Sequence, residues 1–329
     1  MRGHVILLHP HPGPKDTEYE ILPLGLIYVA APLVDQGWKV TALDQRKDRR
    51  WRETVTRLVK TPGTVCVGIS SMTGPQITHA LDMAAVVREA DPDMPIVWGG
   101  VHPSLLPEQT AVHPLVDIVC AGEGETIFPP LVEALAEGRE WRDLPGLCYR
   151  DDQGGVVLNP EAGVPDLDAM PRLPYELFDL EQYKVSALRS GPSLPLVTSR
   201  GCRFRCAYCY IQDFFNRKWR GLSPERVLGE FRRLVDEYGA EGVFLLDDFF
   251  FQDRKRAAAI LQGLVDSGMD VNLYNANCRA DFLYRSDDAF LELMRDAGIR
   301  TLFVGTEAGS DETLKQMLQI GRASCRERV

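Results

Sequence analysis

The sequence lacks the features that mark several classes of protein. No apolar run approaches the length needed to cross a bilayer, and the first residues show neither the apolar core nor the cleavage site of a signal peptide. Positive charge is scarce: 37 Lys and Arg stand against 47 Asp and Glu, a net charge of −10, whereas phosphate binding needs a basic face. We therefore expect no membrane span and no nucleic-acid partner.

Cysteine pairs of the kind that build a disulfide framework are also missing, because five of the eight cysteines are scattered singly along the chain. A reducing compartment, the cytoplasm, is the setting we expect. The chain has 329 residues, of which 45% are hydrophobic and 26% charged. These values are typical of a globular protein with room for two domains.

The carboxyl-terminal segment, residues 320–329 (IGRASCRERV), breaks the helical pattern that begins at Asp311. It looks like translated sequencing-adapter DNA, so we give Cys325 no functional weight. We expect a non-native tail here, and a natural protein that continues beyond residue 319.

Three cysteines, Cys202, Cys206 and Cys209, fall within eight residues, after a short apolar run that predicts a strand. Closely spaced thiolates in such a loop are typical of a metal or cluster site. Structural zinc takes four ligands, usually Cys with His, but all six histidines lie at or before His113, and Cys278 comes from a distant predicted strand. Three thiolates suit a 4Fe–4S cluster that keeps one iron open for another ligand. A zinc site and a chance grouping stay open as alternatives.

Residues 1–140 alternate short apolar runs with longer helical patterns, which predicts an α/β fold with a Rossmann-like, doubly wound parallel sheet. The expected strands are 5–8, 39–43, 65–69, 96–98 and 116–119. Small and polar residues follow three of them, and parallel strand ends meet at one edge of a sheet, so we expect a crevice there that admits a large flat ligand. These residues are Ser70, Ser71, Gly99, Gly100, His102, Gly122, Glu123 and Gly124. Ordinary turns of an α/β domain are the alternative.

Residues 141–194 predict a connector, in which 146–158 has the pattern of a hairpin and prolines punctuate the rest. Residues 195–319 form a second module in β/α order. Ser223 and Pro224 are expected to begin its first helix, as N-cap and first helical residue. Its expected helices are 224–238, 254–267 and 287–297, and its expected strands are 242–246, 270–275 and 300–304.

The spacing C-x-x-x-C-x-x-C, with Tyr208 directly before the third cysteine, resembles the signature loop of radical S-adenosylmethionine (SAM) enzymes. The resemblance implies a partial (β/α)6 barrel, incomplete in this chain, in which Cys202, Cys206 and Cys209 hold a 4Fe–4S cluster. It also implies that the open iron binds SAM and that reductive cleavage of SAM gives a 5′-deoxyadenosyl radical. An external one-electron donor of flavodoxin or ferredoxin type is then the expected protein partner.

Three further stretches resemble strands of that barrel. Residues 243–250 resemble the second strand, in which Asp247 or Asp248 accepts from the amino group of SAM. Residues 275–281 and 302–310 resemble the third and fourth strands.

Each of these stretches contributes candidate cofactor contacts. Arg279 and Glu307 are expected to bind the ribose or the carboxylate of SAM, with Tyr208 as a further contact. Ordinary polar residues at strand ends are the alternative for each acid and for Arg279. The run Phe249-Phe250-Phe251 is expected to pack in the core rather than to contact substrate.

Ahead of this module, Pro23-Leu-Gly-Leu, Gly-Gly-Val-His-Pro-Ser and Gly-Glu-Gly-Glu resemble the cobalamin-binding domain of B12-dependent radical SAM enzymes. Cobalamin domains that supply a lower axial histidine use D-x-H-x-x-G, but the loop after Asp44 has Arg46 in place of His and Arg49 in place of Gly. No histidine of this loop can therefore ligate cobalt. His102 is either a corrin contact or a loop histidine bonded to backbone.

Together the resemblances predict a B12-dependent radical SAM enzyme that acts on a small molecule, with methyl transfer to an unactivated carbon as the expected reaction. A B12-dependent oxidation or ring closure, as in the anaerobic porphyrin-ring cyclases, is the alternative within enzymes. A non-catalytic fragment that binds only corrinoid and cluster is the alternative of another class.

Overall fold

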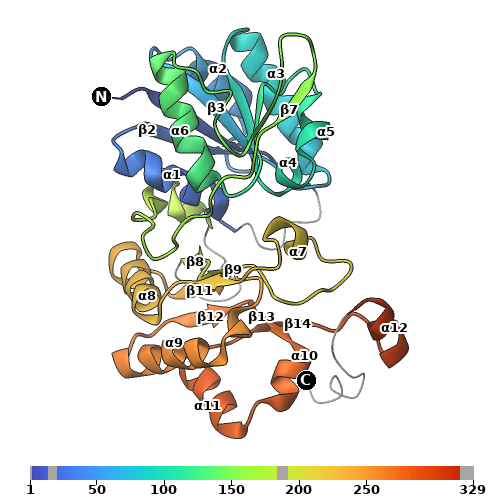
Figure 1. Ribbon diagram of the computed structural model, residues 1–329. Helices are drawn as coiled ribbons and strands as arrows, with labels where there is room; N and C mark the ends of the chain where they lie inside the picture. The colour runs from blue at the N-terminus through green and yellow to red at the C-terminus, as the bar shows by residue number, and fades with distance from the viewer. Residues whose placement is uncertain (1, 14–20, 184–191, 319–329) are drawn as a thin grey trace. The chain divides into compact units, whose positions relative to one another are not determined.

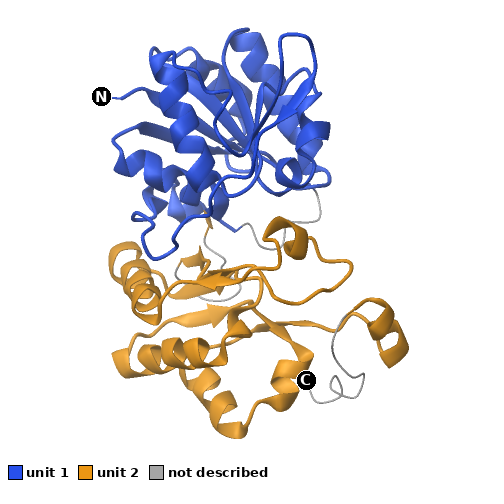
Figure 2. Cartoon of the chain, viewed as in Figure 1, with its two compact units in different colours: residues 1–182 blue, residues 183–329 orange. Residues whose placement is uncertain are grey.

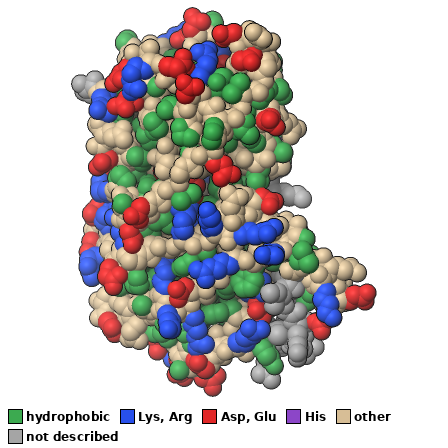
Figure 3. Space-filling model, viewed as in Figure 1, with side chains coloured by type: hydrophobic (Ala, Val, Ile, Leu, Met, Phe, Trp, Pro, Cys, Tyr) green, Lys and Arg blue, Asp and Glu red, His purple; other side chains and the backbone are tan. Residues whose placement is uncertain are grey.

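The computed structural model describes residues 2–13, 21–183 and 192–318, so the expected tail at 320–329 lies outside the described residues. The chain divides into two compact units, Met1–Gln182 and Tyr183–Val329 (Figure 2). On the face drawn in Figure 3, Lys and Arg side chains are interspersed with Asp and Glu. No helix in the described ranges is long and apolar enough to cross a bilayer.

The first unit is built on a seven-stranded sheet in the order β2-β1-β3-β4-β5-β6-β7 (Figure 1). Strands β1 to β5 run parallel, and the antiparallel hairpin β6–β7 extends the sheet beyond β5. The five expected strands are therefore present, each within about two residues of its predicted bounds. The strands are β1 (His4–His9), β2 (Lys39–Asp44), β3 (Thr64–Ser70), β4 (Ile96–Gly99), β5 (Ile118–Cys120), β6 (Leu147–Arg150) and β7 (Val156–Leu158).

Helices cover both faces of this sheet, as a doubly wound topology requires. Residues of α2 and α3 share one apolar core with β1, β3 and β4, which includes the fully buried Ile6, Val67 and Met83. Helices α1 and α6 pack together, with Gly124 at the start of α6 lying against Val29. The helices are α1 (Leu24–Asp35), α2 (Trp51–Val59), α3 (Gln76–Ala90), α4 (Val101–Leu105), α5 (Pro107–Ala111) and α6 (Gly124–Glu137).

The hairpin expected in the connector is present, and it belongs to the sheet of the first unit. The proline-rich segment after it contains two short 3-10 helices, η1 (Tyr175–Leu177) and η2 (Leu180–Tyr183). Tyr175 is fully buried and η1 packs beside β2. Much of the segment expected to link two domains is therefore part of the first unit.

The second unit alternates strands and helices. Strands β8 (Ser193–Leu196), β11 (Gly242–Leu245) and β12 (Asn272–Tyr274) form a parallel sheet in the order β12-β11-β8. A second parallel pair joins β13 (Ala276–Arg279) to β14 (Leu302–Gly305), and in the described part of the chain β14 pairs with β13 alone. Phe303 of β14 is 65% exposed.

The helices that cover these strands are set by local signals. Ser223 accepts a hydrogen bond from the Arg226 amide, so α8 begins at Pro224 as predicted. Asp253 caps α9 in the same way. The remaining elements are β9 (Ser199–Arg200), α7 (Ile211–Phe214), β10 (Arg220–Gly221), α8 (Pro224–Tyr238), η3 (Phe250–Gln252), α9 (Arg254–Ser267), α10 (Ala280–Arg285), α11 (Asp288–Asp296) and α12 (Asp311–Gln316).

The expected strand at residues 270–275 is present as β12. A second strand, β13, follows Asn275 within the stretch 275–281 that resembles the third barrel strand. Asn275 has a φ of 60°, and its amide donates to the Thr301 hydroxyl. This left-handed residue ends β12 and redirects the chain into β13.

Candidate functional site

The loop that carries Cys202, Cys206 and Cys209 follows β9 at the carboxyl end of β8. All three side chains are half-buried, and the Cys209 amide donates to the Cys206 carbonyl at 3.0 Å. Burial raises the pKa of the Cys202 and Cys209 thiols, and a charge on Cys206 raises both further. Cys206 therefore lies close to both of the other thiols.

Gly201 fixes the conformation in which the chain enters this loop. Its φ is 83°, and a Cβ added there would lie 1.9 Å from the Lys218 carbonyl oxygen. Its amide donates to the Asp248 carboxylate at 2.7 Å. Only glycine fits this position, because any side chain would collide with backbone.

Asp247 and Asp248, both proposed as contacts of SAM, have different environments. Asp247 is fully buried: one carboxylate oxygen accepts from the Thr198 amide at 2.6 Å, and the other accepts from the hydroxyls of Thr198 and Ser199. Both oxygens are thus engaged within the protein, so Asp247 positions the strand that leads into the cysteine loop. Asp248 is only half-buried, and burial raises its pKa to about 6, which leaves Asp248 as the candidate of the two.

Tyr208 and Glu307 lie beside Cys206. Burial raises the pKa of Tyr208, and the charges of Cys206 and Glu307, with hydrogen bonds to both side chains, raise it further. The backbone also joins these segments, because the Ala207 amide donates to the Met317 carbonyl just after α12. The chain that follows β14 therefore reaches the cysteine loop.

Arg279, at the end of β13, also meets this loop. Its guanidinium lies 3.8 Å from the centre of the Phe204 ring, between Cys202 and Cys206 in sequence, and its Nε donates to Asp281. This stacking places a cation against the cysteine loop. Phe204 was not singled out from the sequence.

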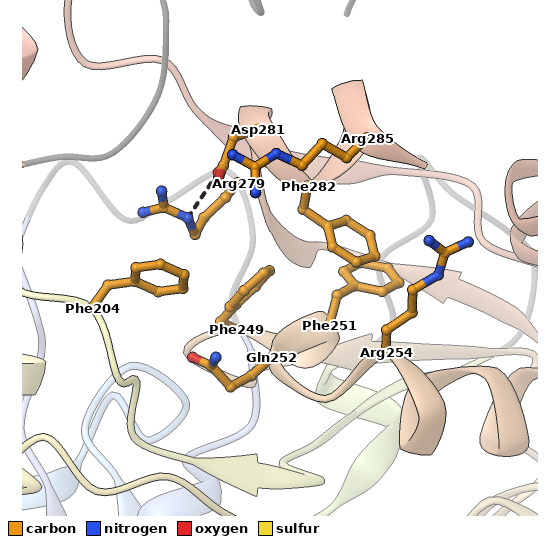
Figure 4. Close-up of a pocket in the computed structure, with 9 residues that line it drawn as sticks. All are labelled: Phe204, Phe249, Phe251, Gln252, Arg254, Arg279, Asp281, Phe282 and Arg285. Carbon is orange, nitrogen blue, oxygen red and sulfur yellow. Dashed lines mark hydrogen bonds and ion pairs between the residues drawn. The ribbon is translucent and has the colours of Figure 1, made fainter. Parts of the chain in front are cut away.

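A pocket of about 290 Å³ opens next to this contact (Figure 4). Its walls include the rings of Phe204, Phe249, Phe251 and Phe282. Gln252 also lines it and accepts from the Cys202 thiol at 3.7 Å and from the Arg203 amide at 3.2 Å. Phe249, Phe250 and Phe251 are buried, as predicted, although two of their rings also face this pocket.

The three thiols of the loop could bind either a single metal ion or an iron–sulfur cluster. Across the ranges that the structure describes, no three His, Cys, Asp or Glu side chains are close enough to share one metal ion. A cluster sets a different requirement, because each thiolate binds its own iron atom. Cys278 is buried in β13, where its thiol contacts the Arg279 carbonyl. The donor set of the loop therefore fits a cluster with three protein ligands.

In the first unit, the residues predicted to form a crevice lie at the carboxyl ends of β3, β4 and β5. Ser71 is fully buried; its amide donates to the Gly99 carbonyl and its own carbonyl accepts from the His102 amide. Gly100 has a φ of 93°, and a Cβ there would lie 2.8 Å from the Ser70 hydroxyl. Burial lowers the pKa of His102, and its Nδ1 lies 3.2 Å from the Thr73 hydroxyl.

Ser104, the last residue of the stretch Gly-Gly-Val-His-Pro-Ser, joins two of these loops and was not singled out from the sequence. Its hydroxyl donates to the Gly100 carbonyl at 2.7 Å and accepts from the Gly122 amide at 3.0 Å. Glu123 is the N-cap residue of α6, which begins at Gly124. The sequence does not show this link, because Gly122 lies in another loop.

The loop after β2 is held by Arg46, the residue in the place of a lower-ligand histidine. Its guanidinium contacts both Asp44 oxygens, at 3.0 and 2.6 Å, and donates to the Ile21 carbonyl. The two side chains are 6% and 1% exposed. Burial alone would raise the pKa of Asp44, but the hydrogen bonds and charge of Arg46 hold it below its usual value. The arginine thus has a structural role here.

Both units match known protein families. The B12 binding domain family matches residues 15–132, and the Radical SAM superfamily matches residues 196–328. An uncharacterized methyltransferase of Pyrococcus horikoshii is 31% identical over 296 residues, which cover 89% of this chain and 62% of the relative. The anaerobic magnesium-protoporphyrin IX monomethyl ester cyclase of Synechocystis sp. is 27% identical over 327 residues, 97% of this chain and 64% of the relative. The chain therefore spans less than two thirds of the length of these relatives.

A solved structure of the radical SAM methyltransferase TsrM from Kitasatospora setae, with tryptophan substrate and a SAM analogue bound, is similar to the whole chain. The TM-score is 0.80 and the identity 22%, with 64% of that chain covered. At this identity the likeness concerns the fold, and it confirms the predicted α/β class. With the two matched domains in this order, the chain belongs to the radical SAM superfamily, in the group whose radical SAM domain follows a B12-binding domain.

Proposed function

We propose that this chain is the cofactor-binding part of an enzyme that cleaves SAM reductively and uses the resulting 5′-deoxyadenosyl radical for methyl transfer to an unactivated carbon. The observation that carries the proposal is the loop of Cys202, Cys206 and Cys209 at a strand end of a radical SAM domain that follows a B12-binding domain. A small molecule is the substrate we propose.

The second unit holds the proposed cluster. Cys202, Cys206 and Cys209, as thiolates, would each hold one iron of the cluster. When bound, the cluster supplies the electron that breaks a carbon–sulfur bond of SAM. Two acids hold the loop in the shape that presents the thiols. Asp248 accepts from the Gly201 amide. Asp247 accepts from Thr198 and Ser199, just before the loop.

Four side chains of this unit are suited to bind SAM. Asp248 lies half-buried at the end of β11, next to the loop, where its carboxylate can accept from the SAM ammonium. Glu307 and Tyr208 interact beside Cys206, and Arg279 lies over Phe204. We assign the ribose or carboxylate of SAM to Glu307 and Arg279, with Tyr208 as a further contact.

The first unit holds the proposed cobalamin. Gly100 and Gly122, both with positive φ, let a flat macrocycle approach the backbone, and Ser104 keeps their loops together. Ser70, Ser71, Gly99, His102, Glu123 and Gly124 complete the proposed contacts. When bound, cobalamin carries the methyl group, and the Asp44 loop gives cobalt no histidine because Arg46 occupies that place.

Ring closure or oxidation is a second candidate, because the Synechocystis relative is a cyclase. Methyl transfer is preferred because the Pyrococcus horikoshii relative is named a methyltransferase. Binding of the cofactors without turnover is the alternative of another class. We further propose a cytoplasmic location, since every cysteine in the described ranges is free, and an external one-electron donor.

Anaerobic reconstitution tests the proposal. The chain is loaded with iron, sulfide and hydroxocobalamin, absorption and EPR spectra are recorded, and 5′-deoxyadenosine is assayed after SAM and dithionite are added. We expect cluster and cobalamin signals together with 5′-deoxyadenosine. Both cofactors without 5′-deoxyadenosine would favour a binding fragment, and zinc without iron or labile sulfide would favour a structural metal site. Identification of the product then distinguishes the two enzyme reactions: a methylated product indicates methyl transfer, and a dehydrogenated or cyclised product indicates oxidation or ring closure.

A further inference from the structure

Arg256, in the first turn of α9, is a buried cation that is not among the proposed cofactor contacts. Its side chain is 9% exposed. The Nε atom donates to the Leu222 carbonyl at 2.6 Å, and one terminal nitrogen donates to the Thr198 carbonyl, also at 2.6 Å. Burial of a charged group costs free energy unless it is hydrogen-bonded, so these two bonds fix the position of the guanidinium.

The two carbonyls lie at the two ends of the segment that carries the three cysteines. Thr198 directly precedes β9, and Leu222 directly follows β10. Strands β9 and β10 pair antiparallel, with Ser199 opposite Gly221, and the Leu222 amide donates to the Thr198 carbonyl at 2.9 Å. The chain therefore leaves and returns at one place, and Arg256 joins both ends from another helix.

Thr198 is bound by two buried charged side chains. Its amide and its hydroxyl donate to Asp247, and its carbonyl accepts from Arg256. Burial raises the pKa of Asp247, whereas the hydrogen bonds from Ser199 and Thr198 and the charge of Arg256 lower it. A buried carboxylate is costly without a nearby cation. Arg256 therefore also supports the acid that holds the start of the loop.

Trp219 extends this contact toward the first cysteine. The Arg256 guanidinium lies 5.7 Å from the centre of the Trp219 ring, and the guanidinium of Arg203, the residue after Cys202, lies 5.6 Å from the same ring. Cations over an indole ring are attracted to it. The fit is tight, because a Cβ added at Gly221 would lie 2.8 Å from the Arg256 Nε.

We propose that Arg256 is the positioning residue of the cysteine loop: it closes segment 198–222 at its base and thereby fixes the spacing of the three thiols. It acts through the backbone of Thr198 and Leu222 rather than by contact with a thiol. The inference rests on the proposed function only for the identity of the group that the thiols hold. The opening of the segment can therefore be measured on the chain without a cluster.

Limited trypsin digestion of the full chain, with fragments identified by mass spectrometry, measures this opening. Arg203, Arg205, Arg217 and Lys218 are exposed cleavage sites inside the segment. Arg256→Lys keeps the positive charge, but an ammonium does not reproduce the planar fork that binds two carbonyls. We expect cleavage inside the segment to accelerate on the order of tenfold, because proteolysis follows the population of locally opened chain.

Gly221→Ala is the second variant, because it keeps the arginine and displaces it; the same sites should be cleaved faster. Lys255→Met is the matched control, since it removes an exposed charge from the residue next to Arg256. Gly229→Ala adds a methyl group that has nothing within 4 Å. Both controls should be digested at the parent rate. Cleavage after Arg232, exposed on α8, reports on the rest of the unit and should stay unchanged in every variant.

Reconstitution with iron and sulfide gives a readout that a purely structural role would not change. The cluster formed in Arg256→Lys should differ from the parent in its EPR g values and should lose iron to a chelator faster, because the thiols are no longer held at one spacing. A residue that only stabilises the fold would lower the yield of the cluster and leave its spectrum at that of the parent.

A parent rate of cleavage inside the segment in either variant would overturn the proposal. An equal acceleration after Arg232 would also overturn it, since the whole unit would then be loosened. A parent EPR spectrum and a parent rate of iron loss in Arg256→Lys would show that the residue does not position the thiols. Absence of a cluster in the parent chain contradicts the proposed function instead, whereas the digestion still decides the role of Arg256.

Discussion

The Asp248 carboxylate accepts a hydrogen bond from the Gly201 amide at 2.7 Å. This contact ties the end of β11 to the residue before the first cysteine of the loop. It also makes one acid serve two purposes, because the same carboxylate is the proposed partner of the SAM ammonium.

Asp248→Asn is expected to stabilise the protein at neutral pH. Burial raises the pKa of Asp248 from 3.8 to about 6, so the folded state binds its proton more tightly than the unfolded chain. The stability that this proton supplies is present below pH 4 and is lost as pH rises through 6. Chemical denaturation should therefore show a gain of up to about 3 kcal/mol at pH 8 and none near pH 3.5.

The same variant should weaken SAM binding on the order of tenfold, because an amide offers the ammonium no charge. Asp236→Asn, at an exposed position of α8, serves as control and should alter neither property. A pH-independent stability difference in Asp248→Asn would contradict the assigned ionisation.

Gly201→Ala should abolish cluster assembly. The added methyl would meet the Lys218 carbonyl oxygen at 1.9 Å, so the backbone before Cys202 must move. Gly239→Ala is the matched control: it also has a positive φ, 64°, but nothing within 4 Å of the added Cβ. The control should lose only about 1 kcal/mol of stability from the backbone conformation and bind iron normally. Normal iron content in Gly201→Ala would show that the loop tolerates another path.

Replacement of any one of Cys202, Cys206 and Cys209 by serine should reduce the iron and sulfide bound after reconstitution to background. Cys278→Ser tests whether the buried thiol of β13 joins them. We expect that variant to keep the cluster spectrum, because its thiol contacts the Arg279 carbonyl. Loss of the cluster in Cys278→Ser, with folding intact by circular dichroism, would reveal a fourth protein ligand and close the position proposed for SAM.

Arg46→Ala should destabilise the first unit by about 3 to 5 kcal/mol at pH 7, because it leaves the buried Asp44 carboxylate without its cation. Arg46 holds the pKa of Asp44 below its ordinary value, so the contribution of the pair is present above pH 4 and is lost at lower pH. Denaturation curves from pH 7 to pH 3 should therefore converge for parent and variant. Arg172→Ala breaks an exposed pair with Glu176 and should cost less than about 1 kcal/mol.

Much of the fold could be predicted because its signals are local. Ser223 and Pro224 begin α8 by contacts within one turn, and the sequence places this helix correctly. The left-handed conformation of Asn275 between β12 and β13 could not be predicted, because its amide donates to Thr301, which comes 26 residues later in the chain. Helix α1 contains Pro32 and still continues to Asp35, with the Gln36 amide donating to the Pro32 carbonyl.

The candidate site could also be predicted only in part. The spacing of the cysteines singles out the loop, and the family models confirm the superfamily. Two adjacent acids, by contrast, look alike in sequence, and only the bonds of Asp247 to Thr198 and Ser199 distinguish it from Asp248. The contacts of Ser104 and Gln252 could not be predicted, because they join loops that only folding brings together.

The free side of β14 has a practical consequence for work on this chain. Among the described residues, β14 pairs on one side only. Its remaining backbone amides and carbonyls can therefore form hydrogen bonds with a strand of another molecule. The Phe303 side chain, which is about two-thirds exposed, adds an apolar contact surface to this strand edge. Purified protein should therefore tend to self-associate as its concentration rises, and a short peptide able to add one more strand should act as a solubilising cap.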